Sequence, residues 1–130
     1  MIRLTRTLAT AVLALGLAAA PAFAIDVNPT GNWQLSTGEA RFEVTLCGDG
    51  TQLCAALTWL RDDARTPENL AYLNALVVEG AKSTTPVKWK GAVQYDGETF
   101  NGTLTMLNSN TIKLSGCQAI ACESMLLNRI

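Results

Sequence analysis

Histidine is absent from this sequence of 130 residues, and that absence removes several kinds of chemistry at once. Imidazole is the usual general base near neutral pH and the commonest zinc ligand, so histidine-based triads and most zinc centres are excluded. The sequence also contains no Gly-x-Ser-x-Gly motif and no phosphate-binding loop. We therefore expect that the protein is not an enzyme and that it carries neither a metal ion nor an organic cofactor.

Charged residues are also scarce, because they make up only 16% of the chain, with 10 Lys and Arg against 11 Asp and Glu. No basic stripe is present that would attract nucleic acid or anionic lipid, so neither is expected as a partner. Three aspartates, Asp49, Asp62 and Asp63, could suggest calcium, but they lack a complete loop of oxygen ligands and are interpreted as solvated turn charges.

The first 24 residues have the pattern of a signal peptide. Arg3 and Arg6 precede an apolar run over residues 8–20, and Ala22-Phe23-Ala24 has the small-x-small pattern of a cleavage site. The run is too short for a spanning helix, so a retained anchor is the weaker alternative and no stable membrane insertion is expected after cleavage. Cleavage would leave one domain over residues 25–130, with a net charge of −3, in the periplasm or secreted.

Four cysteines in a small exported chain predict a disulfide framework. They are Cys47, Cys54, Cys117 and Cys122, and three pairings can be drawn among them. A four-cysteine zinc site is the competing interpretation, although Cys-x6-Cys and Cys-x4-Cys are looser than the usual zinc-binding spacing.

Apolar and polar residues alternate with a period of two through most of residues 31–130, which predicts β-strands with one buried face. The clearest case is the hairpin over 39–60. Thr66-Pro67-Glu68 has the chemistry of a helix start, and residues 76–81 form a weak strand followed by a loop over 82–86. We predict an all-β fold in which eight antiparallel strands form an up-and-down barrel with one short helix; a flattened sandwich is the alternative.

Side-chain parity allows a first estimate of the strand register. If Cys47 lies opposite Cys54, both sulfurs point outward and Phe42 meets Trp59 on the inner face. The local pairing Cys47–Cys54 is therefore preferred.

The same test applies to the second half of the chain. The Asp96-Gly97 turn sets Gly91 opposite Gly102, the next turn sets Gly102 opposite Gly116, and the last hairpin pairs Cys117 with Cys122.

These registers gather several side chains on the predicted inner face. Three neighbouring glycines would open space there, and an inward carboxylate could meet a cationic or hydroxylated ligand. The alternative is that the glycines let the sheet coil and that aromatic rings fill the gap. The candidate ligand-lining residues are Trp59, Trp89, Gly91, Phe100, Gly102, Gly116 and Glu123.

Two groups of residues carry a family resemblance. Gly31-Asn32-Trp33 together with Arg129 resembles the lipocalin, or calycin, signature, in which an arginine of the last strand packs over a tryptophan that closes one barrel end. Parity independently places Arg129 on the inner face, so a cation–π contact with Trp33 is expected.

A longer set of residues is similar to an exported bacterial family, domain of unknown function 2147. The resemblance runs from residue 31 to 130 through Ala40-Arg41-Phe42-Glu43-Val44, the four cysteines and Arg129. It departs at Leu127, where many members carry an aromatic residue, and in a shorter link from Trp59 to Leu76. The resemblance implies a lipocalin-like barrel and no particular activity.

Two functions fit these observations. The first is a barrel that binds a small apolar or amphipathic molecule in the periplasm. The second is a protein-interaction module, such as an inhibitor of a secreted hydrolase, which would use its loops or the lead-in over 25–30. A hollow interior would favour the first and a solid interior the second. The ligand, the partner and the oligomeric state do not follow from the sequence.

Overall fold

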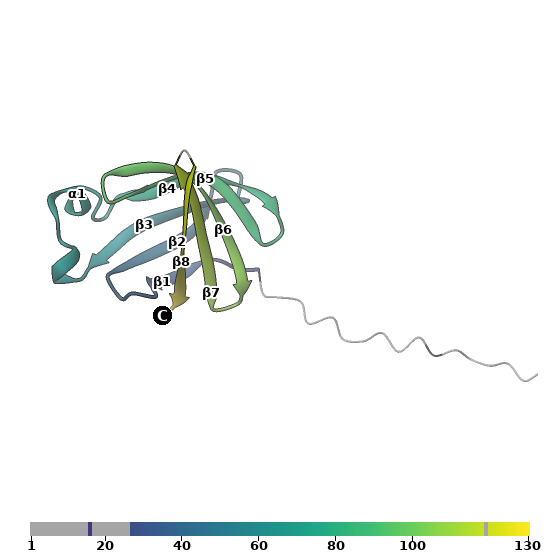
Figure 1. The fold of residues 1–130 in the computed structure, drawn as a ribbon. Helices are drawn as coiled ribbons and strands as arrows, with labels where there is room; N and C mark the ends of the chain where they lie inside the picture. Colours follow the sequence, from purple (N-terminus) through teal and green to yellow (C-terminus); the bar gives the residue numbers. More distant parts are fainter. Residues whose placement is uncertain (1–15, 17–26, 119) are drawn as a thin grey trace, which may run out of the picture.

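In the described part of the chain, which comprises Gly16, residues 27–118 and residues 120–130, eight antiparallel strands close into a barrel (Figure 1). The structure is a computed structural model. Each strand pairs with the next along the chain, and the last pairs with the first. The predicted signal peptide lies outside the described residues except for Gly16. The strands are β1 (Gly31–Leu35), β2 (Ala40–Cys47), β3 (Gln52–Leu60), β4 (Leu76–Thr85), β5 (Lys88–Tyr95), β6 (Glu98–Asn108), β7 (Thr111–Gln118) and β8 (Ala121–Arg129).

The core fills the barrel because the inward positions of the alternating strands are apolar. Along β2, Ala40, Phe42 and Val44 are buried while Arg41 and Glu43 are exposed. Burying a side chain of this size is worth about 1.5–3 kcal/mol, which explains why one face of each strand turns inward. The most deeply buried large side chains are those of Trp33, Leu53, Leu57, Leu60, Met106 and Ile112.

The registers of the β5–β6, β6–β7 and β7–β8 hairpins are those predicted from the alternation of inward and outward side chains. Gly91 lies opposite Gly102, Gly102 opposite Gly116, and Cys117 opposite Cys122. The β1–β2 hairpin places Trp33 opposite Phe42. Short turns with few conformational options transmit the register from one strand to the next.

The predicted register of the β2–β3 hairpin is wrong in two respects. The strands are shifted by two residues near the turn, and a β-bulge changes the pairing again between Phe42 and Arg41. Cys54 lies opposite Thr45, and Phe42 lies opposite Leu57. Thr58 is the extra residue of the bulge, and its hydroxyl donates to the carbonyl of Arg41. One inserted residue reverses parity, so Trp59 points outward, contrary to prediction, and lies under the guanidinium of Arg41 at 4.5 Å.

The link between β3 and β4 contains the 3-10 turn η1 (Asp62–Ala64) and the short helix α1 (Pro67–Leu70). As predicted, the Thr66 hydroxyl caps this helix by accepting from the Asn69 amide, and Pro67 occupies its first position. The buried Asn69 side chain donates to the carbonyl of Ala64 and ties the two turns together. No helix of the described residues is long and apolar enough to cross a membrane.

Strand β4 is longer than predicted, because residues 82–85 continue it. Lys82 pairs with Lys90 and Ser83 with Trp89. The apolar alternation stops after Ala81, so these residues are held by backbone pairing and not by burial, and the sequence pattern carried no sign of them.

One end of the barrel is closed by Trp33 and Arg129. The guanidinium of Arg129 lies 4.4 Å from the centre of the Trp33 ring, in the contact expected from the signature. Arg129 also donates to the carbonyls of Asn28, Thr30 and Ser109, while the Trp33 indole donates to the carbonyl of Pro29. The lead-in over 27–30 is therefore fastened across this end.

Candidate ligand-binding pocket

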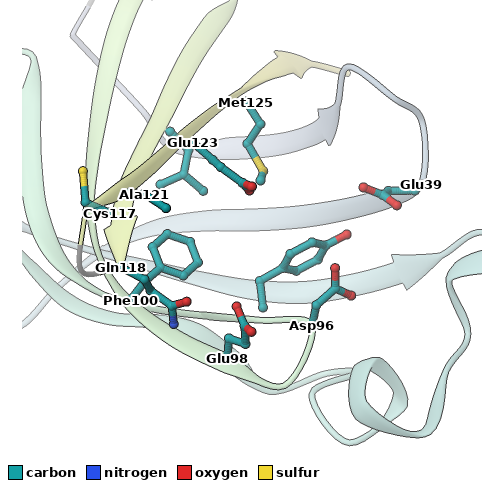
Figure 2. A pocket seen from close by; sticks show the side chains of 12 residues that line it. Glu39, Asp96, Glu98, Phe100, Cys117, Gln118, Ala121, Glu123 and Met125 are labelled. Atoms are coloured by element: carbon teal, nitrogen blue, oxygen red, sulfur yellow. The ribbon is translucent and has the colours of Figure 1, made fainter.

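A pocket of about 290 Å³ lies at the opposite end of the barrel. Because the strands run up and down in sequence order, the turns β1–β2, β5–β6 and β7–β8 meet at this end, away from Trp33 and Arg129. Figure 2 shows the side chains that surround the space. Its lining is Glu39, Tyr95, Asp96, Glu98, Phe100, Leu114, Gly116, Cys117, Gln118, Ala121, Glu123 and Met125.

The row of glycines does not leave the barrel centre empty. A Cβ added at Gly102 would lie 2.6 Å from Cγ2 of Val93, and one at Gly116 would overlap the ring of Phe100. A Cβ at Gly91 would lie 2.9 Å from Cα of Ala81. Two of the three glycines, Gly91 and Gly102, therefore open no space, because the backbone of β4 and the side chains of Val93 and Leu114 lie against them. Beside Gly116 the ring of Phe100 fills part of the gap, as the alternative expects, and Gly116 still lines the pocket.

These contacts predict different effects of alanine at Gly91 and at Gly116. The neighbour of Gly91 is the backbone of β4, which cannot move without separating two strands, so Gly91→Ala is expected to lower the free energy of unfolding by about 1–3 kcal/mol. The neighbour of Gly116 is a ring that can rotate into the pocket, so Gly116→Ala should be milder. Urea denaturation of both variants compares them; a larger loss for Gly116→Ala would contradict the packing described.

The rim of the pocket is acidic. Among its twelve lining residues no lysine or arginine occurs, whereas four carry carboxylates. In Figure 2 these groups surround the same open space as the ring of Phe100; they belong to Glu39, Asp96, Glu98 and Glu123. Sequence reasoning identified Glu123 alone. Of the other three, Asp96 lies in the β5–β6 turn, and Glu39 and Glu98 directly follow turns. The up-and-down topology brings these turns to one end of the barrel, and that was the signal that could have found them.

Tyr95 lies between the rim and the apolar interior. Its hydroxyl oxygen is buried and has no hydrogen-bond partner among the described residues. Burial, then the negative charge of Glu39 and a loose polar contact with its carboxylate that does not meet hydrogen-bond geometry, raise the pKa of this hydroxyl above the usual value for tyrosine. The hydroxyl therefore stays protonated at neutral pH and can both donate and accept.

The raised pKa of Tyr95 predicts a loss of stability at alkaline pH. A group whose pKa is higher in the folded than in the unfolded chain favours unfolding once pH exceeds the unfolded value, which is about 10 for tyrosine. The free energy of unfolding should fall as pH rises above that value, and less steeply in Tyr95→Phe. Urea denaturation at several alkaline pH values measures both slopes; equal slopes would contradict the prediction.

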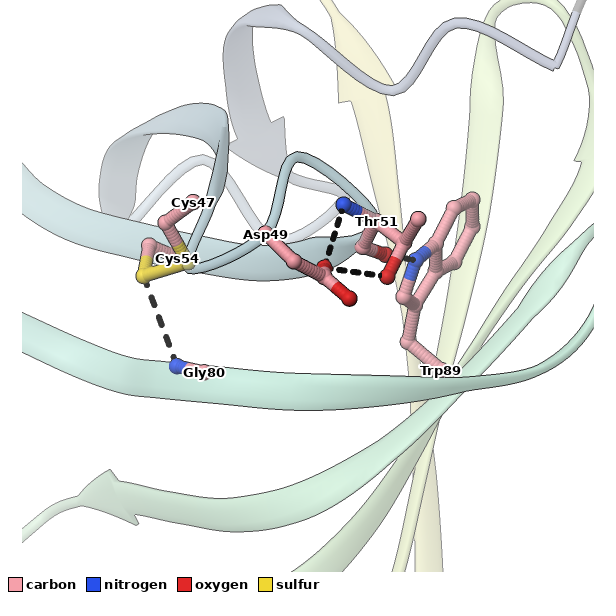
Figure 3. Close-up of a disulfide and its surroundings, with 6 residues drawn as sticks. All are labelled: Cys47, Asp49, Thr51, Cys54, Gly80 and Trp89. Atoms are coloured by element: carbon pink, nitrogen blue, oxygen red, sulfur yellow. Dashed lines mark hydrogen bonds between the residues drawn. A yellow bond between two sulfur atoms is a disulfide. The ribbon is translucent and has the colours of Figure 1, made fainter.

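Below the pocket the barrel is almost solid. A second, apolar space of only about 30 Å³ lies in the core and shares Tyr95, Leu114 and Met125 with the pocket. Trp89 is buried, but its indole donates to the carbonyl of Thr51 in the β2–β3 turn, at the closed end (Figure 3). A ligand would therefore occupy the open end and not the centre of the barrel.

The seven residues predicted to line a ligand site thus separate into three groups. Phe100, Gly116 and Glu123 line the pocket. The others do not: Trp59 is outside, and the remaining three, Trp89, Gly91 and Gly102, belong to the packed interior. Whether the first three contact a ligand stays a prediction.

Both predicted disulfides are present, one at each end of the barrel. Cys117–Cys122 joins β7 to β8 beside the pocket. Cys47–Cys54 joins β2 to β3 at the closed end, where the sulfur of Cys54 accepts from the amide of Gly80 at 3.4 Å (Figure 3). Cysteines in disulfides cannot ligate zinc as thiolates, so the zinc interpretation is wrong. The disulfides indicate an oxidising location outside the cytoplasm.

Two of the three aspartates considered as calcium ligands, Asp49 and Asp63, have other partners. The amide and hydroxyl of Thr51 donate to Asp49, and the hydroxyl contact chiefly lowers the pKa of this exposed carboxyl. Asp63 forms a salt bridge with Arg61 at 2.6 Å. No group of three or more side chains suited to a metal ion occurs within the described ranges.

Comparison with known proteins identifies a family and no activity. A family model described as "Uncharacterized protein conserved in bacteria (DUF2147)" matches residues 31–129, which include all eight strands. No curated protein and no solved structure matches the chain.

Proposed function

The chain belongs to the DUF2147 family, and we propose that it is an exported binding protein that holds a small amphipathic molecule in the pocket at the open end of its barrel. The observation that carries the proposal is the pocket itself. Its volume of about 290 Å³ lies at the lower limit of ordinary small-molecule sites, and it combines apolar walls with a few convergent polar groups.

Binding without catalysis is supported by the chemistry of the lining. The whole chain has no histidine, and its four cysteines are held in disulfides. Carboxylates are the principal titratable groups around the pocket, with Tyr95, and no nucleophile stands beside a base. This arrangement favours recognition of charge and shape over acid–base work.

Export is part of the same proposal. Residues 1–24 have the pattern of a signal peptide, and both disulfides require an oxidising compartment to persist. Mass spectrometry of the protein recovered from the periplasm or medium should give a chain that starts at Ile25. A chain that retains Met1 or the apolar run over 8–20 would contradict cleavage.

Native mass spectrometry with organic extraction tests the binding role, using two matched tryptophan variants. Ala121 is exposed at the rim, so Ala121→Trp would plug the pocket; Ala92 is exposed on β5 outside the pocket, so Ala92→Trp is the control. We expect a co-purifying molecule with the unaltered protein and with Ala92→Trp, and its loss from Ala121→Trp. A bare mass for all three in repeated preparations would overturn the proposal.

The packed barrel centre favours a second candidate, a protein-interaction module such as an inhibitor of a secreted hydrolase. The core void of about 30 Å³ is too small for a ligand, so an interaction role would depend on the turns at the two ends. Cross-linking in the native compartment would distinguish the two: one partner protein captured reproducibly, together with a bare mass, supports the module.

A further inference from the structure

The pocket changes character between its mouth and its floor. The carboxylates of Glu98 and Glu123 are exposed at the rim, whereas Leu114 and Met125 border both the pocket and the apolar space beneath it. A molecule bound along this gradient would keep a polar head at the mouth and place an apolar chain against Phe100 and Met125. The cavity thus fixes an orientation as well as a size.

The charge around the mouth has one sign. Beyond the four rim carboxylates, Glu68 of α1 also approaches, because its Cγ lies 3.3 Å from where a Cβ of Gly97 would be. Arg61 interacts electrostatically with Glu39. Its guanidinium is, however, held by Asp63 and by the carbonyl of Thr37. Within the part of the chain that the structure describes, neither Glu98 nor Glu123 forms an ion pair.

A second observation concerns the Tyr95 hydroxyl, whose neighbour among the rim carboxylates is Glu39. The Tyr95 hydroxyl borders the pocket, is buried, and has no hydrogen-bond partner among residues 27–118 and 120–130. Buried polar atoms normally have a partner, and an orphaned one in a native structure calls for an explanation. A ligand carrying N–H donors would supply that partner, with the tyrosine oxygen as acceptor.

We propose that the pocket selects a protonated aliphatic amine, whose ammonium group lies among Glu98, Glu123 and the Tyr95 hydroxyl while its chain lies against Phe100 and Met125. This inference rests on the proposed function and names its ligand class. The selected ligand has both a positive charge and N–H donors. The charge accounts for the carboxylates at the rim, and the N–H donors account for the Tyr95 hydroxyl.

Three probes with the same chain test the charge preference: octylammonium, octanol and octanoate, titrated calorimetrically at neutral pH and low ionic strength. Octylammonium should bind at least about tenfold more tightly than octanol, and octanoate most weakly, because each carboxylate near the head favours the cation. Added salt should reduce the preference. Equal binding of octanol and octylammonium would overturn the inference.

Matched variants locate the effect. Glu98→Gln/Glu123→Gln should remove most of the preference for octylammonium over octanol and leave octanol binding unchanged. Glu43→Gln/Glu79→Gln makes the same change in net charge at exposed positions outside the pocket, and should preserve it. Equal losses in both double variants would show a general charge effect and reject the assigned site.

The hydrogen bond has its own test. Tyr95→Phe should weaken octylammonium several-fold and leave octyltrimethylammonium, which has no N–H donor, unaffected. Loss of both probes alike would overturn the role of the hydroxyl. If every probe binds the unaltered protein no more tightly than it binds the Ala121→Trp variant, the proposed function fails. If the probes bind the unaltered protein more tightly but without a charge preference, only this inference fails.

Discussion

Trp33→Ala is expected to lower the free energy of unfolding by about 3–5 kcal/mol, the range for truncating a large buried aromatic side chain. Trp33 is 0% exposed, and its indole donates to the carbonyl of Pro29. Its removal would leave a cavity under Arg129 and release the lead-in that Arg129 fastens at Asn28 and Thr30. Urea denaturation measures the loss.

Trp59 provides a matched control, because it is also a tryptophan stacked with an arginine. The ring-to-guanidinium distances are nearly equal, 4.4 Å for Trp33 with Arg129 and 4.5 Å for Trp59 with Arg41. Trp59, however, is 36% exposed on the outer face. Trp59→Ala should therefore cost about 1 kcal/mol or less, since an exposed cation–π pair contributes about 0.5–1 kcal/mol. Equal losses would mean that the stacked pair, and not the burial, closes the barrel end.

The difference between these two tryptophans shows where sequence-based prediction of the fold succeeds. Parity placed Trp33 and Arg129 on the inner face because each turn between paired strands passes its register to the next. It misplaced Trp59 because a bulge inserts Thr58, and the hydroxyl that stabilises this bulge is ordinary on the outer face of a strand. A single sequence carries no distinct signal for such an insertion.

The pocket was harder to predict than the barrel. The glycine register was correct, yet whether Gly116 leaves space depends on where the Phe100 ring turns, and that is decided by side-chain packing. The rim of carboxylates depends on the topology. Glu39, Asp96 and Glu98 stand beside turns, where charge is usually solvated, and only the closed topology makes them neighbours.

Removal of either disulfide is expected to lower stability, whereas only removal of the disulfide beside the pocket is expected to weaken binding. In the chain-entropy model each short loop contributes roughly 2–3 kcal/mol, and sequence separations of 7 and 5 make the two contributions similar. Cys54 is buried and accepts from Gly80, whereas Cys117 and Cys122 are exposed. Cys47→Ala/Cys54→Ala should therefore be the more damaging double variant.

Binding should respond in the opposite order. Cys117 lines the pocket, and its disulfide holds the β7–β8 hairpin that carries Gln118, Ala121 and Glu123 to the rim. Cys117→Ala/Cys122→Ala is expected to weaken octylammonium binding several-fold, measured calorimetrically under conditions where both variants are folded. Cys47→Ala/Cys54→Ala, altered at the closed end, should bind as the unaltered protein does. If the latter variant lost affinity equally, the pocket would depend on the whole barrel and not on its own disulfide-linked hairpin.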